Sequence, residues 1–289
     1  MNLNIAVIIP HFNDTARLRR CLGALVQNDL SDIDILVVDN GSTESLDPVK
    51  DEFPTVRFVS EPRKGAASAR NRGVNETKAD ILAFLDADCI PAPGWLAAVK
   101  ATSGRSDIIG GAIDVFDETP PPRTGAQAFE TVFAFNYRYY IEKKRFSVTA
   151  NLVAERRVFE AVGPFIDGVS EDEEWCWRAG QRGFRIIVDE DMRVLHPTRS
   201  DWNALKRKWH RLTREMFELH RARKGPSARF TWALRALAMP ASAVVHLPRL
   251  FLSPKLATAG DRFRGGATLI RLRLLRAVWM LRQACGLAI

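Results

Sequence analysis

Four short apolar runs within the first 86 residues constrain the fold of this chain more than any other feature. They cover residues 5–9, 33–39, 56–60 and 81–86. Each run is apolar almost throughout instead of alternating with polar residues, which is typical of strands buried on both faces and so of parallel central strands. Because helical patterns separate the runs, the sequence predicts a doubly wound α/β sheet.

The stretch between the first two runs predicts an amphipathic helix that covers this sheet. Asp14 stands where it can cap the helix, and the apolar residues recur at three- and four-residue spacing: Leu18, Cys21, Leu22, Leu25 and Val26. The second half of the chain is less regular. There we expect strands near 107–115, 147–153 and 185–188, and helices near 155–162 and 171–182.

Charge divides the chain into two parts. Residues 1–198 hold 23 Lys and Arg against 30 Asp and Glu, whereas residues 199–289 hold 19 against 4, a net charge of +15. A basic segment of this kind fits nucleic acid, anionic lipid, or solubility alone. Its pattern is helical, and tryptophans and leucines lie among the arginines, which favours a lipid surface. The apolar stripe is Trp202, Leu205, Trp209, Leu212, Met216 and Leu219, and four later arginines could reach lipid phosphates: Arg271, Arg273, Arg276 and Arg282.

No segment of the sequence predicts export or a membrane span. The first apolar run is too short for a spanning helix and lacks the flanks of a secretory signal. Residues 232–252 carry Arg235, His246, Arg249 and two prolines, so their uncharged stretch is shorter than the ~20 residues that span a bilayer. The four cysteines are scattered without a Cys-x-x-Cys pair. We therefore expect a cytoplasmic protein, peripheral on the inner face of the plasma membrane.

Polar residues follow each buried run, at the edge of the sheet where ligands of open α/β folds bind. Asp86 and Asp88 form an Asp-x-Asp pair after the fourth run, and Asp39 ends the second. Carboxylates at such a rim can hold a divalent cation that bridges phosphates, and Asp39 can accept hydrogen bonds from a base or ribose. Both sequences are also ordinary turn sequences, so this interpretation stays open on the residues alone.

Five motifs follow one another along the chain, from about residue 4 to residue 198: VIIPHFND, ILVVDNGSTE, GAASARNRG, ILAFLDADCIPAPGWL and VSEDEEWCWR. This ordered series resembles the inverting family 2 glycosyltransferases with the GT-A fold. The resemblance implies a mostly parallel sheet flanked by helices in a catalytic domain of residues 1–225. Its nucleotide-binding half would end near residue 115 and its acceptor half would follow. Residues 226–289 would be a basic, amphipathic helical extension.

The resemblance also implies roles for individual residues. Asp172 would be the catalytic base, with Glu171 in support, although Ser170 stands where many relatives have Gly. The metal, Mg²⁺ or Mn²⁺, would be held by Asp88, Asp86 and His196. The nucleotide sugar, most often a UDP-sugar, would be bound by Pro10, Asn13, Asp39, Gly65, Arg70 and Asp86.

The expected reaction is transfer of a sugar to a hydroxyl of a glycan or lipid-linked acceptor, in envelope or exopolysaccharide synthesis. Trp175, beside the proposed base, is the candidate platform for the acceptor, although a tryptophan at helical spacing is more often a core residue. The acidic residues from 171 to 174 also fit a simple helix start. Lys206 to Trp209 does not match the Gln-x-x-Arg-Trp element of processive relatives, so we expect non-processive transfer.

Two other classes of function compete with this interpretation. A sugar nucleotidyltransferase would share the nucleotide-binding architecture, but it usually has a Gly-rich loop after the first strand, and PHFND is not one. A non-catalytic protein could bind anionic lipid or nucleic acid through its basic segment. Nucleic acid is the weaker of these two partners, because the sequence holds no recognisable DNA- or RNA-binding motif.

Overall fold

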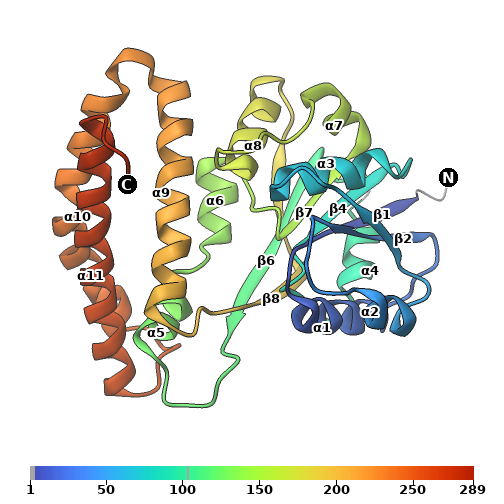
Figure 1. Ribbon diagram of the computed structural model, residues 1–289, viewed down its shortest axis with the longest axis horizontal. Coiled ribbons are helices and arrows are strands. Elements are labelled where there is room, and N and C mark those ends of the chain that lie inside the picture. The colour runs from blue at the N-terminus through green and yellow to red at the C-terminus, as the bar shows by residue number, and fades with distance from the viewer. Residues whose placement is uncertain (1–3, 103) are drawn as a thin grey trace. The chain divides into compact units, whose positions relative to one another are not determined.

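The structure is a computed structural model that describes residues 4–102 and 104–289, and the chain divides into two compact units (Figure 1). The first, called the sheet unit here, runs to Asp114 and adds Asn136–Asp167 and Glu171–His196. The second, called the helical unit, contains Val115–Phe135, Gly168–Ser170 and Pro197–Ile289.

Eight strands form one sheet among the described residues, in the order β3-β2-β1-β4-β7-β6-β8-β5. The pairs β3–β2, β2–β1 and β1–β4 are parallel, which confirms the prediction for the apolar runs, whereas β4–β7, β7–β6 and β8–β5 are antiparallel. The strands are β1 (Ile5–His11), β2 (Ile33–Asp39), β3 (Arg57–Ser60), β4 (Ile81–Leu85), β5 (Ile90–Pro91), β6 (Ile108–Phe116), β7 (Asn151–Glu155) and β8 (Ile186–Pro197).

Helices cover this sheet, and the first begins where the sequence predicts. The side chain of Asp14 caps α1 by accepting a hydrogen bond from the backbone N–H of Arg17 at 3.3 Å. The predicted helices near 155–162 and 171–182 are present as well. The helices of the sheet unit are α1 (Thr15–Leu25), α2 (Asp47–Glu52), α3 (Ala66–Asn75), α4 (Trp95–Lys100), α6 (Tyr137–Lys144), α7 (Arg156–Val162) and α8 (Glu171–Gln181).

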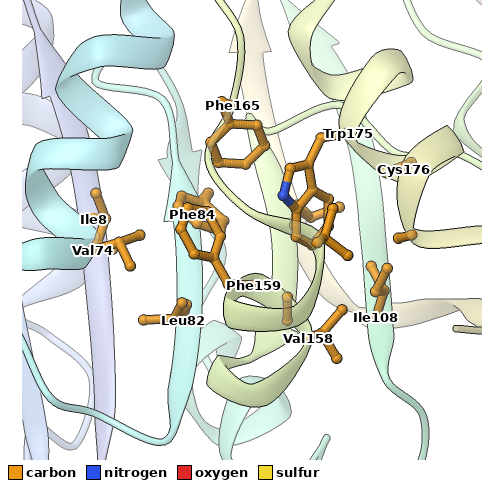
Figure 2. Close-up of a cluster of buried hydrophobic side chains, with 14 of the residues drawn as sticks. Ile8, Val74, Leu82, Phe84, Ile108, Val158, Phe159, Phe165, Trp175 and Cys176 are labelled. Carbon is orange, nitrogen blue, oxygen red and sulfur yellow. The ribbon is translucent and has the colours of Figure 1, made fainter. Parts of the chain in front are cut away.

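One large apolar cluster joins the sheet to α3, α7 and α8 (Figure 2). At its centre Phe84 of β4 meets Phe165 edge to face, with ring centroids 5.2 Å apart, and Phe159 of α7 stacks on Trp175 of α8. Such aromatic side chains each bury a large apolar area. The cluster therefore fixes the position of α8, the helix whose first turn carries the acidic residues.

The helical unit is built from α5 (Gly125–Phe133), α9 (Trp202–Lys224), the short η1 (Gly225–Ser227), α10 (Ala228–Phe251) and α11 (Ala259–Ala284). Helices α10 and α11 run antiparallel and in close contact, since Leu247 and Leu250 near the end of α10 lie against the start of α11. A Cβ atom added to Gly265 would lie 3.0 Å from Leu250 and 3.2 Å from Ala128 of α5. A residue without a side chain is what allows these three helices to approach one another.

One helical stretch among the described residues, Trp202–Phe251, contains an 18-residue window long and apolar enough to cross a membrane by length and composition alone. Its mean hydropathy is 1.2, and 17% of the window is buried. The expectation of no membrane span rests on counting uncharged residues in a row, which is a stricter criterion than averaging hydropathy, and the averaged criterion selects this stretch as a candidate.

Candidate functional site

The loops that follow β1 and β2 are tied together at the carboxyl edge of the sheet. Asn13, in the left-handed region at φ +46°, accepts a hydrogen bond from the backbone N–H of Thr43 at 2.7 Å. Asp39 accepts one from the N–H of Ser42 at 3.3 Å and lies 3.5 Å from the buried ring of His11. Pro10, the residue before the last of β1, is half-buried. The structure thus brings Pro10, Asn13 and Asp39 together at one rim.

Asn40 and Asp167 shape the next loop, and the sequence analysis singled out neither. Asn40 donates to the carbonyls of Glu61 and Arg63 and accepts from the N–H of Gly65 at 2.8 Å. Asp167 accepts from Ser68 at 2.6 Å, and its carboxylate would lie 2.1 Å from a Cβ at residue 65. At φ +130° and in that space, only glycine fits at residue 65.

Arg70 of α3 connects the Asp-x-Asp loop to the acidic start of α8. Its guanidinium is buried, donates to Asp86 at 2.6 Å, and donates through its other terminal nitrogen to Glu171. Burial disfavours the charge, but the carboxylates of Asp86 and Glu171 outweigh it and raise the pKa of the arginine. Two segments about 85 residues apart in the chain are therefore held within the reach of one guanidinium.

Asp172 follows directly in the first turn of α8 and has an unusual proton affinity. Burial raises its pKa from the ordinary 3.8 to about 7, and the neighbouring charge of Glu171 adds to this, while a hydrogen bond from the N–H of Glu173 at 2.8 Å and the charge of Arg70 oppose it. A carboxylate that titrates near neutral pH can accept a proton during a reaction and release it afterwards.

Strand pairing explains how Asp88 and His196 come together. The short strand β5 pairs antiparallel with β8, so Ile90 lies opposite Leu195. Asp88, two residues before Ile90, and His196, one residue after Leu195, are consequently neighbours. Nε2 of the buried His196 lies 3.5 Å from an oxygen of Asp88. This pairing was not visible in the sequence, because a two-residue strand leaves no periodic pattern.

The predicted metal ligands are only partly assembled. Asp88 and His196 form a pair with one carboxylate and one imidazole, whereas an oxygen of Asp86 engages Arg70. Among the described residues no group of three His, Cys, Asp or Glu side chains is arranged to hold a metal ion. The pair nevertheless fits a cation such as Mg²⁺ or Mn²⁺, which binds few protein side chains and completes its sphere with water and substrate phosphates.

The expectation that Trp175 forms an acceptor platform is wrong. Its side chain has 0% exposure, and its indole N–H donates to the carbonyl of Gly163 at 2.9 Å. Figure 2 shows the ring among Phe84, Phe159 and Phe165, inside the apolar cluster. A ring that packs against other side chains on its faces cannot stack on a sugar, so Trp175 anchors α8 instead. Trp177, two residues on, is 44% exposed.

A cavity of about 530 Å³ lies elsewhere in the sheet unit. It is lined by the end of α1, the loop that follows it, β5 and α4, with residues such as Ala24, Asn28 and Lys100, and none of the predicted site residues lines it. The chemistry-bearing residues and this cavity are therefore separate features.

At the carboxyl edge of the sheet, the unit presents three chemical capacities. The rim at Asp39 can accept hydrogen bonds, the pair of Asp88 and His196 can hold a cation, and Asp172 can take up a proton. Arg70 supplies a buried positive charge between the second and third of these. A reaction that transfers a group from a phosphate-bearing ligand to a hydroxyl, with the phosphate as leaving group, uses all three.

Comparison with known proteins points to one family. A family model described as Glycosyl transferase family 2 matches residues 6–163, more than half of the chain. Glycosyltransferase AglE of Haloferax volcanii is 30% identical over 216 residues, which cover 71% of this chain and 70% of that protein. A pre-mycofactocin glycosyltransferase of Mycobacterium tuberculosis is 26% identical over 219 residues, 70% of this chain and 45% of that protein.

A solved structure resembles the whole chain. It is the mannosyltransferase PcManGT from Pyrobaculum calidifontis in complex with GDP-Man and Mn²⁺. The TM-score is 0.52 at 17% sequence identity, and the likeness covers 99% of this chain and 76% of the other. At this level of identity the likeness establishes the fold.

Proposed function

Since the chain belongs to glycosyl transferase family 2 and has the GT-A fold, we propose that it transfers a sugar from a nucleotide-diphosphate sugar to an acceptor hydroxyl with inversion at the anomeric carbon. The chain is a glycosyltransferase. The observation that most supports the finer proposal is the double contact of Arg70, which holds the Asp-x-Asp loop beside the helix start that carries Asp172.

In this mechanism Asp172 is the base. Its carboxylate accepts the proton of the acceptor hydroxyl while the hydroxyl oxygen forms a bond to the anomeric carbon. On the opposite side, the bond from that carbon to the diphosphate oxygen breaks, and the nucleoside diphosphate leaves with the electron pair. Attack and departure on opposite faces invert the configuration. A pKa of about 7 suits this role, because about half of the Asp172 side chains are ionised at neutral pH.

Glu171 and Arg70 are positioning residues in this account. Glu171 accepts from Arg70 and raises the proton affinity of Asp172 through its own charge. Arg70 in turn holds Asp86 at the end of β4. Asp86, Asp39, Asn13, Pro10 and Gly65 line the proposed path of the nucleotide sugar. Changes at Arg70 are expected to disturb both ends of the site at once.

A divalent cation is part of the proposal, and Asp88 and His196 would hold it. When bound, it supplies positive charge that stabilises the leaving diphosphate. The Mn²⁺ named with the structural neighbour supports a divalent cation here as well. Mn²⁺ and Mg²⁺ are both candidates.

For the donor we propose a UDP-sugar, with GDP-mannose as the second candidate because it is named with the structural neighbour. For the acceptor we propose a saccharide or lipid-linked hydroxyl in envelope or exopolysaccharide synthesis, with transfer of one sugar at a time.

We further propose that the enzyme works in the cytoplasm, on an anionic membrane surface. The net charge of +15 in residues 199–289 supports this. So do two exposed apolar stripes at helical spacing in the helical unit. The stripe on α10 is Phe230, Leu234, Leu237, Val244 and Val245, and the stripe on α11 is Phe263, Ile270, Leu274, Val278 and Leu281.

Incubation of the full chain with a panel of nucleotide sugars tests the proposal without knowledge of the acceptor. Slow hydrolysis of a donor that needs Mn²⁺ or Mg²⁺ and is lost in Asp172→Asn is the expected result. Release of pyrophosphate instead of nucleoside diphosphate would indicate a sugar nucleotidyltransferase. No turnover of UDP- or GDP-sugars with either metal would contradict the proposed donor.

A further inference from the structure

Two arginines of α11 point into the helical unit without a carboxylate partner among the described residues. Arg276 is only 5% exposed, and its guanidinium lies over the ring of Trp209 of α9, 4.3 Å from the ring centroid. Arg273, one turn earlier, is half-buried and donates to the sulfur of Met239 of α10 at 3.7 Å. Side chains from α9, α10 and α11 therefore meet around this pair.

The acidic residues of this part of the chain are engaged elsewhere. Residues 199–289, all of which the structure describes, contain four of them. One caps the start of α9 and the other three pair with arginines on their own helices. They are Asp201, Glu215, Glu218 and Asp261, with Arg211, Arg221 and Arg264 as the paired arginines.

Where Arg276 lies over the ring of Trp209, two buried N–H donors lack a hydrogen-bond acceptor. Nε of Arg276 and Nε1 of Trp209 are both buried and make no hydrogen bond within the described part of the chain. They cannot satisfy each other, because both are donors. An unsatisfied buried donor is costly, and a buried charge without a counter-charge is costlier still.

The electrostatics agree with this geometry. Burial lowers the pKa of Arg276 to about 9, and the nearby charge of Arg273 contributes, while burial also lowers the pKa of Arg273 itself. Arg276 still carries its charge at neutral pH. The pair is therefore a concentrated positive charge in a mostly apolar setting, which an anion would stabilise.

We propose that Arg273, Arg276 and the indole N–H of Trp209 form a binding site for a phosphate group, beyond the proposed transfer reaction. A phosphate carries up to two negative charges on tetrahedrally placed oxygens, which suits N–H donors arriving from two helices. A planar carboxylate offers fewer directions and half the charge. The phosphate is either free in solution or part of an anionic lipid, and the test has one arm for each source.

The test uses the full chain and two variants of α11. Arg276→Met removes the buried charge and keeps much of the side-chain volume. Arg271→Met is the matched control, because Arg271 also lies over a tryptophan, Trp202, at 3.9 Å, but it is exposed. One arm measures the melting temperature against inorganic phosphate in EDTA. The other measures flotation with vesicles of phosphatidylglycerol or of phosphatidylcholine.

We expect phosphate to raise the melting temperature of the wild type and of Arg271→Met by several degrees, and Arg276→Met to lose the shift. If the phosphate of a lipid is the ligand, flotation with phosphatidylglycerol falls at least 5-fold more in Arg276→Met than in Arg271→Met. Asp88→Ala keeps either effect, which separates this site from the donor site.

The proposal would be overturned if Arg276→Met and Arg271→Met showed the same melting-temperature shift and the same flotation. It would also be overturned if the wild type responded neither to phosphate nor to phosphatidylglycerol vesicles. If Arg276→Met does not fold, Arg273→Gln replaces it, since Arg273 is less buried. Retention of both effects in a folded Arg273→Gln would then overturn it equally.

Discussion

Replacing Asp172 with Asn should stabilise the protein while abolishing transfer. In the folded protein Asp172 keeps its proton up to about pH 7, whereas an ordinary aspartate loses it near 3.8. Asn is neutral at every pH and retains an oxygen that can accept the hydrogen bond from the N–H of Glu173. The variant therefore removes the free-energy cost of ionising the Asp172 carboxyl in the folded protein. It also removes the proposed base.

The sign and size of the effect follow from the two pKa values. Between pH 4 and pH 7 the folded state binds the proton more tightly than the unfolded chain, so the free energy of unfolding falls as the pH rises through this window. The two pKa values differ by about three pH units, which corresponds to about 4 kcal/mol. Because Asp172 is only half-buried, solvent screening reduces this to about 2 kcal/mol.

Calorimetric melting of the wild type and Asp172→Asn between pH 4 and pH 8.5 measures this difference. We expect Asn to raise the melting temperature by a few degrees at pH 8.5 and to leave it nearly unchanged at pH 4. Glu160→Gln, which removes an exposed carboxylate of α7, is the control and should show no such trend. A variant that is less stable than the wild type at pH 8.5, or that retains near-normal turnover, would refute the argument.

Three further predictions test other parts of the account. Asp88→Ala should weaken Mn²⁺-dependent binding of nucleoside diphosphate by tenfold or more in calorimetric titrations, and an unchanged metal titration would remove Asp88 from the site. Trp175→Ala should lower the free energy of unfolding by about 3–5 kcal/mol, because it empties a core position. The exposed Trp177→Ala should cost less than 1 kcal/mol, and similar costs for both would contradict the described packing. Val244→Glu combined with Val245→Glu should reduce flotation with anionic vesicles at least tenfold, and unchanged flotation would argue against the α10 stripe as a membrane contact.

The four apolar runs predicted strands to within about two residues at either end, because burial on both faces leaves an unbroken apolar pattern. The prediction was poorer for β8, which extends to Pro197 where a strand of four residues was expected. Its middle is rich in charge, and most of those charges are paired with residues outside the strand. Arg105 contacts Asp189, and Arg193 contacts Asp114. Polarity satisfied by distant partners cannot be distinguished from loop polarity in one sequence.

Some residues of the candidate site could also be predicted from the sequence, whereas others depend on contacts between distant elements. Asp86 and Asp88 could be selected from their position after a strand, and Asp172 through the family resemblance. The bridge through Arg70 could not, since it depends on the approach of α3 to α8. The burial of Trp175 depends on the rotation of α8 against Phe159 and Phe165, and helical spacing alone leaves that rotation open. The bridge through Arg70 and the burial of Trp175 are therefore set by contacts between elements, which the pattern within one element does not show.

A crystal structure of the full chain with Mn²⁺ and the nucleoside diphosphate of the preferred donor tests the central claim most directly. Anomalous scattering locates the manganese. The account predicts an ion bound to Asp88 and His196, with the diphosphate beside it and the base of the nucleotide at the rim near Asp39. Manganese and nucleotide bound in the cavity between α1 and α4, away from Asp88, would contradict it.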